Sequence, residues 1–134
     1  MEVNDKVILY VDDDADDREF LCDAIAKQDP AVKVVVAENG LEALDFLSGL
    51  KASQSQLPNL IVLDMNMPFL DGRETFERLK KDETYQTVPI IVFTSSAKPG
   101  DKALFNSLGI EFFTKPCDLS YFNSIISHMI DVCH

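Results

Sequence analysis

Five short apolar runs alternate with five segments of helical periodicity, and this alternation constrains the fold more strongly than any other feature of the chain. The apolar runs lack polar alternation, which is typical of strands buried on both faces of a sheet. They lie at 6–11, 32–37, 60–65, 88–96 and 110–116. The helical segments lie at 17–28, 39–50, 71–82, 100–109 and 118–133. This order predicts an open, mostly parallel sheet with helices on both faces.

Length and charge narrow the class of protein and its partners. The 134 residues fit one domain, with a core from about 6 to 132 and nothing left for an output domain. A formal net charge of -11 makes nucleic acid and anionic membranes unfavourable partners. No run resembles a signal peptide or the roughly 20 apolar residues of a membrane span. Three cysteines without a CxxC pair favour reduced thiols and a cytoplasmic location.

Local signals mark the helix ends and the faces that the helices bury. Asn39 and Asp118 are predicted N-caps. We predict that the fourth helix ends at a glycine C-cap, Gly109. The apolar stripes that should face the sheet include Phe20 in the first helix and Leu119 in the last.

Chemically distinctive side chains follow four of the five predicted strands. They are Asp12, Asp13 and Asp14 after the first strand, Asp64 in the third, Thr94, Ser95 and Ser96 in the fourth, and Lys115 in the fifth. Ligands bind beyond the carboxyl ends of such strands, so these residues should share one edge. Crowded carboxylates demand a cation, and Mg²⁺ fits an oxygen site with open positions. A lysine and a hydroxyl beside it suit a phosphoryl group, for which Asp64 is the best-placed nucleophile.

Four fragments in this order resemble the receiver domain of two-component response regulators: YVDDD, LIVLDMNMPFLDG, VFTSS and FFTKP. The resemblance covers the chain from Lys6 to about Val132. It implies a flavodoxin-like, doubly wound (βα)5 fold, in which three α/β/α layers surround a five-stranded parallel sheet of order 2-1-3-4-5. It also implies a bacterial signalling switch rather than a metabolic enzyme, phosphorylated by a histidine kinase or a histidine phosphotransfer protein.

Position by position, the resemblance implies that Asp64 is the phosphoacceptor. Asp12 and Asp13 would hold Mg²⁺ together with Asp64, Asp13 directly and Asp12 through water. The backbone carbonyl of Asn66 would be a further metal contact, and Mn²⁺ or Ca²⁺ could replace Mg²⁺. The side chains of Asn66 and Ser96 would control access of water to the acyl phosphate and so set its lifetime.

The resemblance also implies a switch. Thr94 would hydrogen-bond the phosphoryl group, and Lys115 would pair first with Asp64 and then with phosphate. The bond from Lys115 to Pro116 is expected to be cis, as it often is in the family. Phe112, three residues before Lys115, falls at the aromatic switch position and lacks the hydroxyl of a tyrosine.

The surface that would change is formed by the fourth helix, the fifth strand and the fifth helix. An unidentified protein partner would recognise it. We expect a monomer or a weak, phosphorylation-dependent dimer.

Several residues admit simpler interpretations. Asp16 and Asp17 are expected only to start the first helix, where the helix dipole favours acids, and Asp14 has no assigned role. The polar segment 48–59 departs from the minimal family pattern and is expected to be an extended helix end or a loop rather than a partner surface. His128 is expected to be a surface or packing residue.

Three alternative functions follow from the same residues. A flavodoxin-like module for FMN would need a Gly- or Ser/Thr-rich phosphate loop, where this chain has DDDADD. A haloacid-dehalogenase-type phosphatase would use Asp12 and Asp14 in a DxD arrangement, although no cap domain follows. A pseudo-receiver would bind partners without phosphorylation, although every motif position is intact.

Overall fold

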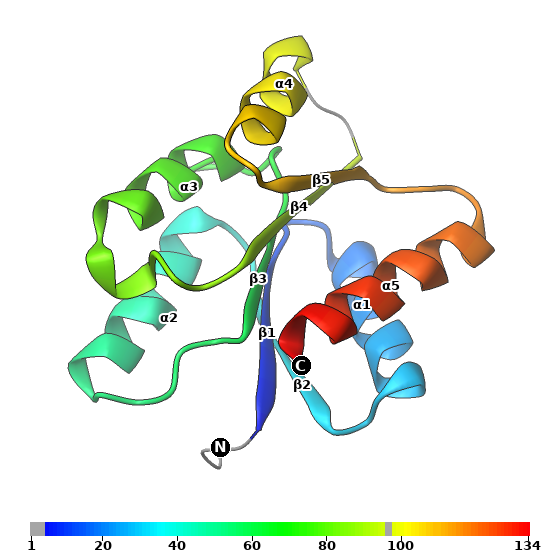
Figure 1. Ribbon diagram of the computed structural model, residues 1–134, viewed down its shortest axis with the longest axis horizontal. Coiled ribbons are helices and arrows are strands. Elements are labelled where there is room, and N and C mark those ends of the chain that lie inside the picture. The colour runs from blue at the N-terminus through cyan, green and yellow to red at the C-terminus, as the bar shows by residue number, and fades with distance from the viewer. Residues whose placement is uncertain (1–4, 96–97) are drawn as a thin grey trace.

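The computed structural model describes residues 5–95 and 98–134. Five parallel strands form one sheet in the order β2-β1-β3-β4-β5 (Figure 1). The strands are β1 (Lys6–Val11), β2 (Val32–Ala37), β3 (Leu60–Leu63), β4 (Ile90–Thr94) and β5 (Glu111–Thr114). The helices are α1 (Ala15–Gln28), α2 (Gly40–Ala52), α3 (Gly72–Lys81), α4 (Pro99–Ser107) and α5 (Leu119–Cys133), and a 3-10 turn, η1, spans Glu83–Tyr85. The predicted α/β class and strand order are confirmed.

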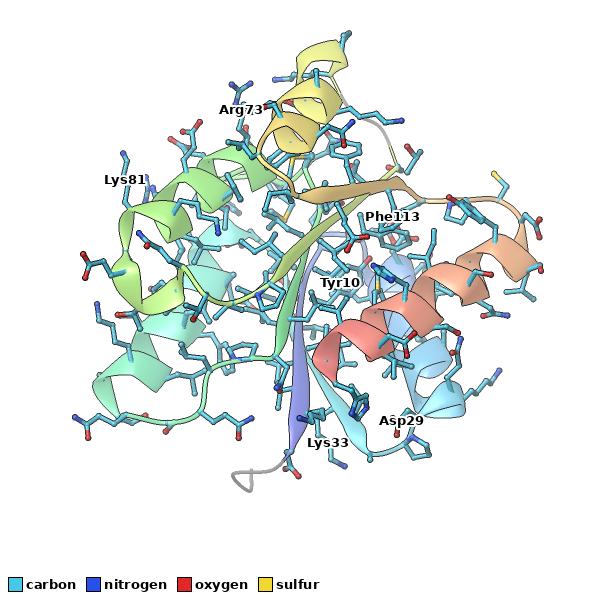
Figure 2. The ribbon with its side chains drawn as sticks, viewed as in Figure 1. Tyr10, Asp29, Lys33, Arg73, Lys81 and Phe113 are labelled. Atoms are coloured by element: carbon cyan, nitrogen blue, oxygen red, sulfur yellow. The ribbon has the colours of Figure 1, made fainter. Side chains whose placement is uncertain are left out.

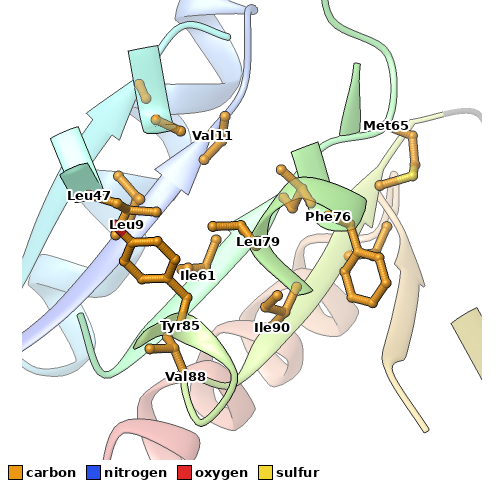
Figure 3. Close-up of a cluster of buried hydrophobic side chains, with 14 of the residues drawn as sticks. Leu9, Val11, Leu47, Ile61, Met65, Phe76, Leu79, Tyr85, Val88 and Ile90 are labelled. Carbon is orange, nitrogen blue, oxygen red and sulfur yellow. The ribbon is translucent and has the colours of Figure 1, made fainter. Parts of the chain in front are cut away.

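The helices cover both faces of the sheet and make three layers. Helices α1 and α5 contact each other on one face, and α2 contacts α3 on the other (Figure 1). Successive residues of β1 therefore alternate between two cores, with Leu9 and Val11 in the α2/α3 core and Ile8 and Tyr10 in the α1/α5 core. All four are fully buried, which explains the unbroken apolar run. Figure 3 shows the core under α2 and α3.

The predicted caps are confirmed by their hydrogen bonds. The Asn39 side chain accepts from the backbone N–H of Glu42 at 2.9 Å, and the Asp118 side chain accepts from that of Ser120. Gly109 has φ +74°, a conformation that disfavours other residues, and it follows the end of α4. These contacts satisfy backbone groups that a helix end leaves without a partner.

Of two expectations about the helices, the one for the 48–59 segment is confirmed and the one for the apolar stripes needs correction. Helix α2 continues to Ala52, so the first part of the 48–59 segment is helix and only the remainder is a loop. Phe20 and Leu119 are 54% and 59% exposed rather than buried against the sheet. A helix that covers a sheet buries only a stripe, so apolar residues at the edge of the periodic pattern stay in solvent. No helix in the described ranges has the length and apolar character needed to cross a membrane.

Candidate functional site

The register of the sheet brings two aspartates side by side. Val11 of β1 pairs with Leu63 of β3, so Asp12 and Asp64 leave neighbouring strands at the same level. The Asp64 N–H donates to the Val11 carbonyl at 3.0 Å, and the Asp12 N–H donates to the Ala37 carbonyl at 3.0 Å. Both residues are buried, at 0% and 3% exposure, which is unusual for aspartate unless it is paired.

Asp13 completes a group of three acids. Carboxylate oxygens of Asp12, Asp13 and Asp64 lie within 4.8 Å of one another, and Asp13 is exposed. Asp13 and Asn66 also line a cavity of about 420 Å³ between the β3–α3 loop and α4. Hard oxygen donors that open onto water at one side fit Mg²⁺ or Mn²⁺, which keeps part of its hydration shell. The donor set therefore fits a divalent cation.

Asp12 is bound on both of its carboxylate oxygens. Oδ2 accepts from the Tyr10 hydroxyl at 2.5 Å and from Lys115 Nζ at 2.6 Å, while Oδ1 accepts from the Asp14 N–H at 2.9 Å. Burial, reinforced by the charge of Asp12, raises the pKa of Tyr10 far above its usual value, so Tyr10 remains a donor. Figure 2 shows Tyr10 in the interior, on the α1/α5 side of the sheet.

The contact with Tyr10 was not predicted from the sequence. The available signal was the strand period, because residues two apart lie on the same face of a strand. A tyrosine two residues before a buried aspartate therefore has its hydroxyl within reach of that carboxylate.

Lys115 contacts three carboxylates. Its Nζ lies 2.6 Å from Asp12, 2.7 Å from Asp17 and 3.5 Å from Asp64. Burial alone would lower the pKa of Lys115, but the hydrogen bonds to Asp12 and Asp17 and the charge of Asp64 outweigh it and raise that pKa. Lys115 is thus held as a cation. Asp17, expected only to start α1, is a residue of this site.

The buried environment of Asp64 destabilises its ionised form. Burial raises the pKa of Asp64, while a hydrogen bond from Thr94 and the attraction of Lys115 act in the opposite direction. The Asn66 N–H also donates to Asp64 Oδ1 at 3.3 Å. The Asn66 side-chain amide donates to Thr94 Oγ1 at 3.4 Å, so the loop after β3 is connected to the end of β4.

The predicted switch residues lie on adjacent strands. Thr94 is fully buried and pairs with Thr114 in the register of β4 and β5. Phe112 is half-buried, and its ring centroid is 6.1 Å from that of Phe105 on α4. Phe113 points to the other face and meets His128 edge-on at 5.9 Å, which agrees with the packing role expected for His128.

Two further expectations concern the Lys115–Pro116 peptide bond and Ser96. The expected cis bond between Lys115 and Pro116 is wrong, because the structure has no cis peptide bond there. A prolyl bond favours trans by only about 0.5–1 kcal/mol, and here the trans form already lets Lys115 reach its carboxylates. Ser96, expected to influence phosphate lifetime, lies outside the described residues.

The remaining aspartates of the 12–17 run, Asp14 and Asp16, stabilise the start of α1. The Asp14 side chain accepts from the Asp17 N–H at 3.0 Å and caps α1. Asp16 is exposed in the first turn, where the helix dipole favours it. Because Asp14 is engaged as a cap, it does not form a catalytic pair with Asp12, as a DxD phosphatase would require.

The loop between β3 and α3 shows two unusual features. Gly72 packs so closely on the strand end that a Cβ there would overlap the Asp64 carbonyl oxygen and lie 2.8 Å from the Met65 Cα. Phe69 has φ +69° and is 83% exposed. The Leu70 N–H donates to the Pro68 carbonyl at 2.8 Å and closes a γ-turn around Phe69, a strained arrangement for a bulky residue.

Comparisons with known proteins identify the family of the chain. A family model described as the response regulator receiver domain matches residues 8–127. Response regulator Rre1 of Synechocystis sp. is 30% identical over 124 residues, which are 92% of this chain and 51% of that protein. Response regulator Rcp1 of the same organism is 32% identical over 97 residues, covering 72% of this chain and 66% of Rcp1. The chain thus spans about half the length of Rre1.

A methylesterase relative is matched only in part. The protein-glutamate methylesterase/protein-glutamine glutaminase 1 of Syntrophomonas wolfei is 33% identical over 114 residues, which are 83% of this chain but 30% of that protein. This similarity therefore assigns no esterase activity to the chain.

Solved structures show the same fold. The phosphorylated cyanobacterial phytochrome response regulator RcpA has a TM-score of 0.82 at 29% identity, covering 94% of this chain and 91% of its own. The Mn(2+)-bound form of Rcp1 has a TM-score of 0.79 at 28% identity, covering 92% and 90%. The family model spans nearly the whole chain and the sheet order agrees with it. The protein therefore belongs to the response regulator receiver domain family, whose members act in two-component signalling through phosphorylation of an aspartate.

Proposed function

We propose that Asp64 is the phosphoacceptor of this chain and that a histidine kinase or a histidine phosphotransfer protein supplies the phosphoryl group. The observation that carries the proposal is the convergence of Asp12, Asp13 and Asp64 within 4.8 Å, with Lys115 beside them. The likeness to phytochrome response regulators supports a sensor kinase at the start of the pathway.

In the proposed step, a carboxylate oxygen of Asp64 attacks the phosphorus of a phosphohistidine. The new P–O bond forms while the P–N bond breaks, and its electron pair remains on the imidazole nitrogen of the partner. Lys115 neutralises charge on the phosphoryl oxygens and Thr94 donates a hydrogen bond to them. Asp12, Asp13 and Asp64, with the Asn66 carbonyl, would hold Mg²⁺, which supplies further positive charge when bound.

The product is an aspartyl phosphate, which replaces a single negative charge by about -1.5 to -2. Thr94 would respond to this change at the end of β4, and Phe112 lies on the adjacent strand β5, opposite Val92. Because Phe112 packs against Phe105, its movement would be transmitted to α4. The proposed output surface is therefore α4, β5 and α5, recognised by a protein partner. The side chains of Asn66 and Ser96 would set how long the phosphate persists.

Uptake of phosphate from a small donor tests this function. The protein is incubated with acetyl phosphate and Mg²⁺, and the intact mass is measured. We expect one added phosphoryl group, which should be lost in Asp64→Asn and in the presence of a chelator. Equal uptake by Asp64→Asn would contradict the proposal, and absence of uptake by the wild type would favour a pseudo-receiver. Turnover of a phosphate ester would instead favour a phosphatase.

A further inference from the structure

The ammonium of Lys115 has as many N–H donors as it has carboxylate partners. A lysine ammonium carries three donors and no acceptor. Its neighbours are the carboxylates of Asp12, Asp17 and Asp64. A phosphoryl oxygen on Asp64 can therefore gain a short hydrogen bond from Lys115 only if one of these contacts lengthens or breaks.

The three contacts are unequal. The distances to Asp12 and Asp17 are 2.6 and 2.7 Å, which are typical of strong charge-assisted hydrogen bonds. The distance to Asp64 is 3.5 Å, which is at the outer limit for a hydrogen bond. In the unphosphorylated protein, the ammonium is thus drawn toward the first strand and the first helix, away from Asp64.

The cavities around the site agree with this orientation. Lys115 and Asp17 line a cavity of about 250 Å³ between α1 and α5, together with Tyr10, Phe20, Phe93 and Phe122. Asp13 and Asn66 line the separate cavity of about 420 Å³ on the α3/α4 side. Lys115 therefore shares its surroundings with Asp17 rather than with the open side of the metal site.

We propose that Asp17 is a positioning residue that holds the Lys115 ammonium away from Asp64 and releases it when a phosphoryl group arrives. This inference rests on the proposed function, because it describes where the Lys115 ammonium lies before Asp64 is phosphorylated. Asp17 acts through Lys115 and does not itself touch the reacting atoms.

Of the two carboxylates at short distance, Asp17 is the one that the Lys115 ammonium can leave at the lower cost. Asp12 is fully buried, so loss of the ammonium would leave its charge with only the Tyr10 hydroxyl and the Asp14 N–H as donors. The Asp17 side chain is 40% exposed at the start of a helix, so water can replace the ammonium. The helix itself does not depend on the contact, since the Asp17 backbone N–H is held by Asp14.

The contact can be tested without any phosphoryl group. In protein labelled with ¹⁵N and ¹³C, a scalar coupling across the hydrogen bond between Lys115 Nζ and Asp17 Cγ should be detected in the absence of ligands. It should disappear when beryllofluoride and Mg²⁺ are added, because Nζ then turns to the phosphoryl mimic. A missing coupling in the free protein, or one that persists in the complex, would overturn the proposal.

Three variants separate positioning from general electrostatics. Asp17→Asn removes the anchor, Asp16→Asn removes the same charge from an exposed neighbour that does not contact Lys115, and Asp17→Glu keeps an anionic anchor. Binding of beryllofluoride at saturating Mg²⁺ is followed by ¹⁹F NMR. For a half-exposed ion pair we expect Asp17→Asn to bind about three- to fivefold more tightly than wild type. Asp16→Asn should gain less, and Asp17→Glu should return to the wild-type affinity.

Unchanged or weaker binding by Asp17→Asn would overturn the proposal, as would an equal gain in Asp16→Asn. Failure of the proposed function gives a different result, in which the wild-type protein binds no beryllofluoride at all. The scalar coupling in the free protein still reports on the Asp17–Lys115 contact in that case.

Discussion

The two sides of the site differ in how their charges are satisfied. On the α1/α5 side, Asp12 is buried and accepts hydrogen bonds from Tyr10, Lys115 and the Asp14 backbone. On the α3/α4 side, Asp13 is exposed and borders the larger cavity. Adjacent aspartates in the sequence thus have opposite surroundings, one fixed by the protein and the other open to a ligand.

This difference separates stability from ligand binding. A buried carboxylate with three donors contributes to the folded state whether or not a cation is bound, because its removal leaves those donors unpaired. An exposed carboxylate among other acids adds repulsion until a cation arrives. The α1/α5 side, which is closed around Asp12, fixes the geometry of the site. The α3/α4 side, which is open at Asp13, receives the ligand.

The sharpest test of this difference replaces Asp12 and Asp13 by alanine, one at a time. Asp12→Ala removes the shortest carboxylate contact of Lys115 and the carboxylate acceptor of the Tyr10 hydroxyl, so we expect a loss of about 3–5 kcal/mol in the free energy of unfolding. Asp13→Ala should change that free energy by less than about 0.5 kcal/mol. Urea unfolding in chelator measures both. Calorimetry should show that Asp13→Ala nevertheless loses Mg²⁺ affinity, and comparable destabilisation by the two variants would refute the distinction.

Tyr10→Phe tests the closed side with a smaller change. It removes one hydroxyl that donates to a charged acceptor, and we expect a loss of about 1.5–3 kcal/mol in unfolding free energy. Mg²⁺ affinity should change little, because Tyr10 lies behind Asp12 and not at the open cavity. Thermal and urea unfolding provide the measurement, and an unaltered stability would show that water replaces the hydroxyl.

Gly72→Ala tests the α3/α4 side of the site by displacing the backbone at Asp64 and Met65. The new methyl group would meet the carbonyl of Asp64 and the Cα of Met65, neither of which is a flexible side-chain end. We expect a loss of about 1–3 kcal/mol together with weaker Mg²⁺ binding. Gly49→Ala is the matched control, since it lies within α2 and a Cβ there would meet no atom of the described residues within 4 Å apart from its own helical turn. It should gain up to about 1 kcal/mol from helix propensity.

The smallest effect concerns the pH dependence of Asp64. Its pKa in the folded protein is raised, chiefly by burial, while Thr94 and Lys115 partly cancel the shift. The folded state then binds more protons than the unfolded state, so the Asp64 contribution to stability falls as pH rises from the ordinary carboxyl pKa through the raised one. In chelator, Asp64→Asn should therefore exceed the wild type in stability at neutral pH, and this advantage should shrink below the ordinary pKa. A difference that is independent of pH would contradict the raised pKa.

The sequence predicted the fold well because its signals are local. The uninterrupted apolar runs reflect strands buried on both faces. Asn39 and Asp118 begin helices and Gly109 follows the end of one, each through contacts within a few residues. The outward positions of Phe20 and Leu119 were missed because periodicity identifies a broad apolar side but not the width that the sheet covers. Phe20 instead contacts Phe122, with ring centroids 4.9 Å apart, so α5 sets its surroundings.

The site was predictable as a set of strand ends but not as a network. Strand order and length place Asp12, Asp64 and Lys115 at one edge, since parallel strands end together. The contact between Asp17 and Lys115 joins residues 98 positions apart and depends on how α1 packs beside α5. Such packing determines which carboxylates accept hydrogen bonds from the lysine ammonium. A local sequence pattern does not predict this choice.

The γ-turn at Phe69 has a practical consequence. The chain contains no tryptophan, so a single one introduced there would be its only indole fluorophore. Phe69 is 83% exposed on the loop that follows Asp64, so Phe69→Trp would exchange one solvent-facing aromatic ring for another. Its emission would report cation and phosphoryl binding optically, from the rim of the site, while the buried hydrogen bonds behind Asp12 remain untouched.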